Sequence, residues 1–124
     1  MKRAILILVL ISAAGPSAQA QGDAAKGEKT FRICAACHTA DAATNKVGPY
    51  LKGVVGRKAG SVEGYNYSPA MKAKGDEGLI WTESNLDAYL TNPQGFVPKD
   101  KMAFPGVKKP EDRADIIAYL KTKM

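Results

Sequence analysis

The stretch Cys34-Ala35-Ala36-Cys37-His38 holds both cysteines of the 124-residue chain and its only histidine. On a helix, residues three apart lie on one face, so both thiols would point the same way. Two thiols at this spacing, followed at once by an imidazole, predict covalent attachment of a c-type haem. Cys34 and Cys37 would form thioethers with the two vinyl groups on one edge of the porphyrin, and His38 would supply a nitrogen ligand to the iron.

Three other kinds of site use a pair of cysteines at this spacing: a redox dithiol, half of a zinc site and a short-loop disulfide. A zinc ion takes about four ligands, whereas this stretch contains all three Cys and His side chains of the chain. A thioredoxin-like dithiol requires βαβ patterning, which we do not find in the sequence. A disulfide would close a loop so small that it gains little stability. Haem attachment is therefore the favoured interpretation.

Residues 1–20 have the pattern of a secretory signal peptide. Lys2 and Arg3 precede an apolar run over 4–11, and Ala18-Gln19-Ala20 fits a small-x-small cleavage site. The apolar run is too short for a membrane anchor, because crossing ~30 Å of hydrocarbon takes about 20 apolar residues. We expect cleavage to release a soluble domain, residues 21–124, into the periplasm.

The composition and size of this domain argue against nucleic-acid binding and are consistent with a bound cofactor. Without Lys2 and Arg3, the 18 basic residues fall to 16 against 12 acidic ones, which leaves a net charge of +4. This modest excess, with no basic run interleaved with aromatic residues, does not indicate nucleic-acid binding. A domain of this size has a marginal apolar core, and a covalently held porphyrin would enlarge it.

Capping residues and apolar spacing predict a set of helices joined by loops. The expected helices are 24–36, 69–74 with Gly75 just past its end, 83–91, and a last helix that begins at Pro110. Gly27 and Phe31 share a face of the first helix, and the apolar stripe of the last helix, with Tyr119 beside it, is its natural partner. Residues 53–64 are glycine-rich and residues 94–110 are proline-rich, so both stretches are expected to be loops.

The second ligand of the iron is less constrained than the first. Since His38 is the only histidine, a haem with two histidine ligands from one chain is excluded. A thioether, a lysine and an open position remain. Met102 lies within the proline-stiffened loop, whereas Met71 lies in a short helix flanked by lysines, so Met102 is the favoured ligand.

Three further groups, one backbone carbonyl and two side chains, have the hydrogen-bonding chemistry that a haem pocket requires. The carbonyl of Pro49 could accept the ring N–H of the ligating imidazole. Arg57 could pair with a propionate, and the indole N–H of Trp81 could donate to one.

The chain resembles class I c-type cytochromes, a family that includes bacterial cytochrome c2 and mitochondrial cytochrome c. The likeness covers nearly all of residues 22–123. It rests on the motifs Cys34–His38, Gly48–Leu51, Gly56–Lys58, Gly64–Tyr67, Trp81, Tyr89–Pro93, Val97–Phe104 and Asp115–Leu120. It implies an all-α cytochrome c fold, in which the N- and C-terminal helices cross near Gly27 and Tyr119 and short helices and loops wrap around one covalently bound haem.

The resemblance also implies a role for each site residue. Cys34 and Cys37 would hold the haem, and His38 and Met102 would be the axial ligands. The Pro49 carbonyl would receive the His38 ring N–H. Propionates would be bonded by Arg57, Tyr67 and Trp81, and Tyr89 would lie near the Met102 sulfur.

Two departures from the family pattern affect the expected pocket. Asp100 stands where the family commonly has a threonine that bonds to a propionate. An ionised aspartate cannot donate that bond. The stretch between Gly75 and Trp81 is also longer than in the mitochondrial proteins.

The expected function is one-electron transfer by a soluble periplasmic monomer. Its expected partners are membrane redox complexes, with a bc1-type donor and a terminal oxidase or photosynthetic reaction centre as acceptor, or a periplasmic redox enzyme. Lysines would ring the haem edge and steer docking: Lys46, Lys52, Lys72, Lys74, Lys99, Lys101, Lys108 and Lys109. The alternatives are a weak peroxidase or gas-binding protein with a displaceable Met102, and a module that delivers electrons to one fixed enzyme.

Overall fold

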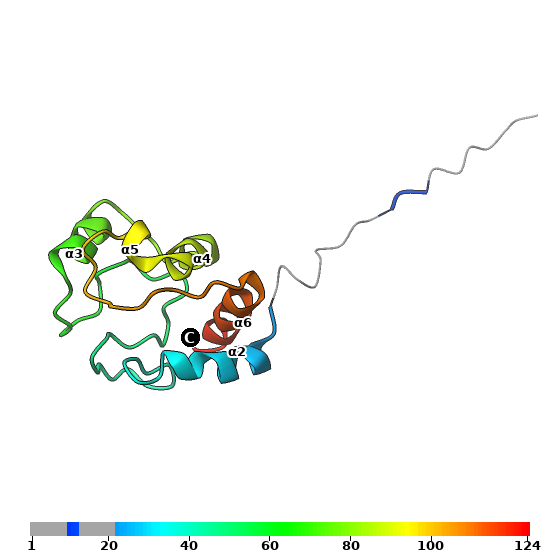
Figure 1. The fold of residues 1–124 in the computed structure, drawn as a ribbon, viewed down its shortest axis with the longest axis horizontal. Helices are drawn as coiled ribbons and strands as arrows, with labels where there is room; N and C mark the ends of the chain where they lie inside the picture. Colours follow the sequence, from blue (N-terminus) through cyan, green and yellow to red (C-terminus); the bar gives the residue numbers. More distant parts are fainter. Residues whose placement is uncertain (1–9, 13–21) are drawn as a thin grey trace, which may run out of the picture.

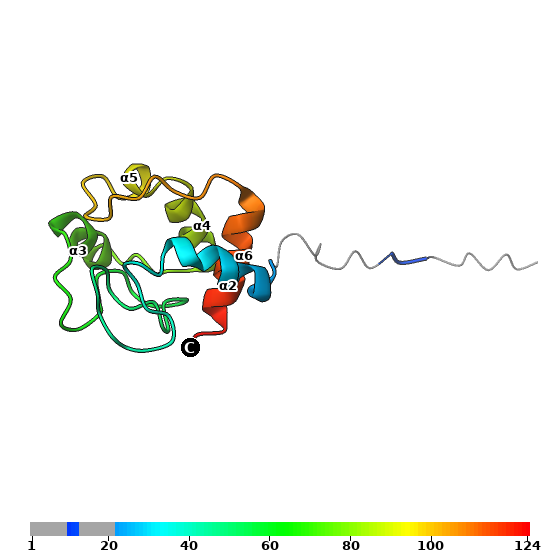
Figure 2. The same ribbon diagram turned by 60° about the horizontal axis from the view of Figure 1, so that its bottom comes forward.

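The first and last helices of residues 22–124 cross each other at one edge of this segment (Figures 1 and 2). The computed structural model describes residues 10–12 and 22–124. The helices are α2 (Ala24–Thr30) and α6 (Pro110–Lys121). Apart from residues 10–12, the expected signal peptide and its cleavage site lie outside the described residues, so both stay predictions.

Gly27 allows α2 and α6 to cross in close contact. A Cβ atom at this position would overlap the carbonyl oxygen of Asp115 and lie 2.8 Å from Cβ of Tyr119. The Phe31 and Tyr119 rings pack beside it, with centroids 5.3 Å apart. The predicted packing of the Gly27 and Phe31 face against the last helix is confirmed.

The first helix ends earlier than predicted. Instead of running to residue 36, α2 stops at Thr30 and continues as a 3₁₀ helix, η1 (Phe31–Ile33), followed by turns. The chain tightens there because Cys34 N–H bonds to the Phe31 carbonyl at 2.7 Å, three residues back rather than four. Such tightening is common at the end of an α-helix. The thiol-bearing residues therefore lie on tight turns that follow the helix.

Helix α3 (Pro69–Asp76) runs two residues longer than predicted. Ser68 caps its start by accepting from Met71 N–H at 3.0 Å. The prediction that Gly75 lies past the helix end is wrong, because this glycine is needed inside it. A Cβ on Gly75 would overlap the Ala59 carbonyl, so the glycine permits close contact with that loop. The glycine beyond the end is Gly78, with φ +96°.

Helix α4 (Glu83–Thr91) has the predicted bounds. The Thr82 side chain caps it by accepting from Asn85 N–H at 3.1 Å. The region predicted to be an uninterrupted loop contains one further helix, α5 (Pro93–Phe96). The Asn92 side chain caps α5 through Gly95 N–H at 3.1 Å. A four-residue helix is too short to show an apolar period in the sequence.

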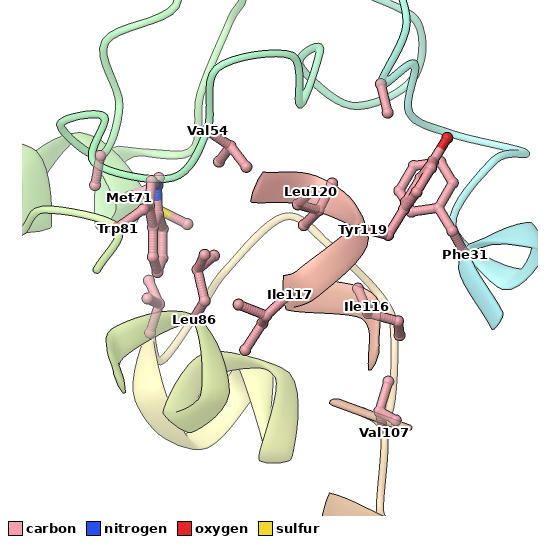
Figure 3. Packing of buried hydrophobic residues seen from close by; sticks show 13 residues of the cluster. Phe31, Val54, Met71, Trp81, Leu86, Val107, Ile116, Ile117, Tyr119 and Leu120 are labelled. Atoms are coloured by element: carbon pink, nitrogen blue, oxygen red, sulfur yellow. The ribbon is translucent and has the colours of Figure 1, made fainter. Parts of the chain in front are cut away.

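The apolar core lies between α4, α6 and the loops that face them. Figure 3 shows Leu86 of α4 and Ile117 of α6 pointing toward each other, with Trp81 beside them. All three side chains are buried. Within the described residues the only β pairing is an isolated bridge between Lys58 and Ile80, so the all-α prediction is confirmed. In residues 10–12 and 22–124, every helix is too short or too polar to cross a bilayer.

Candidate haem site

Both thiols and the imidazole of the attachment motif lie on two successive turns after η1. Cys37 N–H bonds to the Cys34 carbonyl at 3.1 Å, and His38 N–H bonds to the same carbonyl at 3.0 Å. Cys34 and Cys37 are free thiols, and both are partly buried. The chain therefore presents two unpaired sulfurs within one turn and an imidazole directly after them.

The His38 ring is held by the backbone of a distant loop. Its Nδ1 atom lies 2.7 Å from the carbonyl oxygen of Pro49. Because a carbonyl only accepts, Nδ1 carries the proton and donates it, which leaves Nε2 with a free lone pair. Burial lowers the pKa of His38, against the opposing effect of the Pro49 bond. A neutral, oriented imidazole is what a metal ligand requires.

Gly48 shapes the same pocket, and our sequence analysis assigned it no role. A Cβ atom on Gly48 would overlap Cε1 of His38 and lie 2.7 Å from its Nδ1. Its N–H bonds to the Cys37 carbonyl at 2.8 Å. Gly48 thus joins the attachment turn to the loop that holds the ring. The one sequence signal for this role is a glycine directly before the acceptor proline.

The state of Cys34 argues against a redox dithiol. Burial, together with the neighbouring Cys37, raises the pKa of the Cys34 thiol to about 11. Redox-active cysteines usually have a lowered pKa, because the thiolate is the reactive form. The raised pKa of Cys34 therefore disfavours the thiolate that a redox dithiol requires.

Met102 comes from the loop that follows α5. Its sulfur lies 3.9 Å from Oη of Tyr89, so the predicted neighbourhood of these two residues is present in the structure. The Tyr89 hydroxyl also donates to Oδ2 of Asp100. Gln94 secures the loop with one amide nitrogen, which lies 3.0 Å from the carbonyl oxygens of both Asp100 and Met102. Gln94 was not identified from the sequence, because its role depends on how the loop folds back.

Arg57 and Trp81, two of the predicted propionate partners, are joined by backbone pairing. The Trp81 N–H donates to the Arg57 carbonyl at 2.8 Å. The Arg57 guanidinium donates to the carbonyls of Tyr50 and Lys52 at 3.0 and 3.3 Å. Its Nε atom, however, is buried and has no hydrogen-bond partner among the described residues. A buried guanidinium N–H without an acceptor fits an anionic group that belongs beside it.

Tyr67, the third predicted propionate partner, keeps its proton available. Its oxygen accepts the Val62 N–H at 3.0 Å, and burial raises the pKa of the hydroxyl. The ring packs edge-on against Tyr65, with centroids 4.8 Å apart. The hydroxyl is therefore positioned by accepting one bond and has a proton left to donate.

These residues fit a covalently attached haem. The chain offers two unpaired thiols on one turn, an imidazole with a free Nε2, a thioether from a second loop and an unpartnered Arg57 Nε. Their chemistry matches, in order, the vinyl groups, the two axial positions and a propionate.

Comparisons with known proteins give a consistent result. The sequence profile described as Cytochrome c matches residues 24–123. The cytochrome c2 of Agrobacterium tumefaciens (strain II Chrys) is 50% identical over 101 residues, covering 81% of this chain and 91% of that protein. The cytochrome c2 of Rhodomicrobium vannielii is 52% identical over 108 residues, covering 86% of this chain and 84% of that protein.

Solved structures agree with the sequence comparisons. Cytochrome cH from Methylobacterium extorquens is 51% identical, with a TM-score of 0.75 over 82% of this chain and 100% of that one. Ferricytochrome c2 from Rhodopseudomonas palustris is 40% identical, with a TM-score of 0.76 over 82% of this chain and 99% of that one.

Proposed function

This chain belongs to the cytochrome c family, and from that premise we propose that it is a periplasmic electron carrier whose haem iron is ligated by His38 and Met102. That it carries covalent haem c and transfers electrons, rather than acting as an enzyme, follows from the family itself. The ligands, the compartment and the partners are the proposal.

The observation that carries the proposal is the 2.7 Å bond between His38 Nδ1 and the Pro49 oxygen. It fixes the orientation of the ring and directs Nε2 away from the bond. Haem supplies a one-electron iron couple when it is bound. The chain supplies a rigid ligand frame, and little rearrangement is then needed between the two oxidation states.

Met102 is proposed as the second ligand because hydrogen bonds to other segments of the chain fix the loop that carries it. Gln94 holds the carbonyl of Met102, and Lys101 donates to the Asn66 carbonyl at 2.9 Å. A thioether raises the potential of a haem, since it favours the ferrous state. Cys34 and Cys37 would form the thioethers to the porphyrin, and Arg57, Tyr67 and Trp81 would bond to propionates.

The proposed partners are membrane redox complexes. We expect a bc1-type donor and a terminal oxidase or photosynthetic reaction centre as acceptor, or a periplasmic redox enzyme. The exposure of the proposed docking lysines supports this. Seven of the eight are exposed, and only Lys74 is half-buried. Export of the chain by its first 20 residues would bring it to these complexes.

The ligation is tested by replacing methionines in the haem-loaded protein. Met102→Ala should abolish the iron–sulfur absorption band of the ferric protein and let the ferrous form bind CO. Met124→Ala is the matched control, because Met124 is exposed at the chain end, and it should keep the band. If Met102→Ala kept the band, Met102 would not be the ligand. Rapid CO binding by the unaltered ferrous protein at neutral pH would instead favour the gas-binding alternative.

A further inference from the structure

The Tyr89 hydroxyl lies between two acceptors of unequal strength. One is the Asp100 carboxylate, to which it is hydrogen-bonded. The other is the Met102 sulfur at 3.9 Å, close to the outer limit for a bond to sulfur. A phenol has one proton to donate. A carboxylate is a much stronger hydrogen-bond acceptor than a thioether. The Tyr89 hydroxyl therefore donates its hydrogen bond to Asp100 and not to the Met102 sulfur.

The position of Asp100 is set by its backbone. Its N–H bonds to the Val97 carbonyl at 3.0 Å, and its carbonyl accepts from Gln94. Lys99, just before it, has φ +66°, a left-handed conformation that turns the chain sharply. The aspartate is therefore directed at Tyr89 by the same loop that carries Met102.

Among the described residues, no cation forms an ion pair with the Asp100 carboxylate, and the ion pairs that form involve other acidic groups. The neighbouring Lys101 ammonium bonds to the Asn66 carbonyl and lies over the Tyr65 ring. Asp100 is only half-buried, so partial exposure to solvent, together with the Tyr89 bond, takes the place of a counter-ion.

We propose that Asp100 tunes the haem by withholding the Tyr89 proton from the Met102 sulfur and by placing a negative charge beside it. This proposal rests on Met102 being a ligand. A sulfur that receives no hydrogen bond donates more electron density to the iron, and a nearby negative charge stabilises the more positive ferric state. Both effects lower the reduction potential relative to a chain with a neutral residue at position 100.

Two substitutions separate the effects of charge and hydrogen bonding. Asp100→Asn keeps the shape and an acceptor oxygen but removes the charge. It should shift the ferrous–ferric equilibrium toward the ferrous form by roughly tenfold, which is ~59 mV for one electron. Asp76→Asn is the matched control, because Asp76 is exposed on α3 and forms no ion pair or side-chain hydrogen bond with other described residues. It should shift the equilibrium less than twofold.

Asp100→Ala also removes the acceptor, so the Tyr89 proton becomes available to the sulfur. The iron–sulfur band should then move in wavelength, and adding Tyr89→Phe should reverse that movement. The proposal would be overturned if Asp100→Asn shifted the ferrous–ferric equilibrium no more than Asp76→Asn does. It would also be overturned if Asp100→Ala left the wavelength of the iron–sulfur band unchanged. A wild-type ferric protein with no band at all would overturn the ligation by Met102, and this proposal with it.

Discussion

Gly48 positions the His38 ring through the absence of a side chain. Its backbone bonds to the attachment turn, while the next residue, Pro49, accepts the ring N–H. Since φ at Gly48 is not in the left-handed region, an alanine could adopt this backbone. The three nearest contacts of a Cβ atom at this position would all be with the His38 imidazole.

Gly48→Ala should therefore displace the ring without disturbing the local backbone conformation. We expect the free energy of unfolding of the haem-loaded protein to fall by roughly 1–3 kcal/mol, as for an overpacked core. Denaturant unfolding followed by haem absorbance measures this. Val47→Ala is the control, because Val47 is 72% exposed, and equal stability of the two variants would disprove the role of Gly48.

The contacts of individual site residues were predicted from the sequence better than the bounds of the helices. The attachment motif and the Pro49 acceptor could be predicted from the residues, because haem chemistry dictates residue types and spacings. The Tyr89 neighbourhood of Met102 was implied only by the resemblance to class I c-type cytochromes. The bonds of Gln94 and of Asp100 could not be predicted. They depend on how a long loop returns to α4, and no sequence period encodes that return.

At the scale of elements, helix boundaries were the weakest predictions. The bounds of α4 were correct because Thr82 caps its start and a proline follows its end. The first helix was predicted too long, since the change to 3₁₀ bonding after Thr30 leaves no mark in propensity. The predicted end of helix α3 is too early because a glycine commonly marks the end of a helix, whereas the contact of Gly75 with Ala59 requires a glycine inside this one.

The crossing of α2 and α6 gives a prediction in which two effects compete. Gly27→Ala should gain about 1 kcal/mol of helix propensity. The new Cβ would overlap the Asp115 carbonyl, and separating the helices should cost more, so we expect a net loss of about 1–3 kcal/mol. Chemical denaturation measures the difference. Lys26→Ala, at an exposed position of α2, should change little, and a stabilised Gly27→Ala protein would refute the tight crossing.

Arg113 joins α6 to α4 and to the loop between them, a role that the sequence did not reveal. Its Nε donates to Asp87 at 2.7 Å, and its Nη1 donates to the carbonyls of Val107 and Lys108 at 3.0 and 3.1 Å. The guanidinium is almost fully buried, whereas about half of the Asp87 side chain is exposed. The bonds to the carbonyls should therefore matter more than the ion pair.

Arg113→Met should accordingly destabilise the protein by about 2–3 kcal/mol, because buried carbonyls lose their donor. Asp87→Asn should cost less than about 1 kcal/mol, since the Asp87 side of the ion pair is about half exposed and solvent screens it. Thermal or denaturant unfolding of both variants checks the order. A larger effect from Asp87→Asn would show that the ion pair, not the carbonyl bonds, holds these elements together.

At the scale of the whole molecule, we expect the charged surface to affect how fast the carrier meets its proposed partners. The exposed lysines include Lys72 and Lys99, and residues 21–124 carry a net charge of +4. Long-range attraction to an acidic surface accelerates encounter, and salt screens it. The fold leaves these side chains accessible for that role.

Association with a purified terminal oxidase should slow at least several-fold as ionic strength rises from 0.01 to 0.1 M, where the screening length falls from about 30 to about 10 Å. Stopped-flow oxidation of the ferrous protein measures the rate. Lys72→Glu should weaken this dependence, whereas Lys29→Glu, on α2 and outside the proposed docking set, should leave it intact. A rate insensitive to salt would rule out electrostatic steering.

We propose that His38 and Met102 of one chain would occupy both axial positions of a covalent haem that exchanges single electrons. An optically monitored redox titration of the mature, haem-loaded protein tests it most directly. We predict one reversible one-electron transition, with a six-coordinate spectrum in both states and an iron–sulfur band in the ferric form. A five-coordinate spectrum in the resting state, or a transition that does not fit one electron, would contradict it.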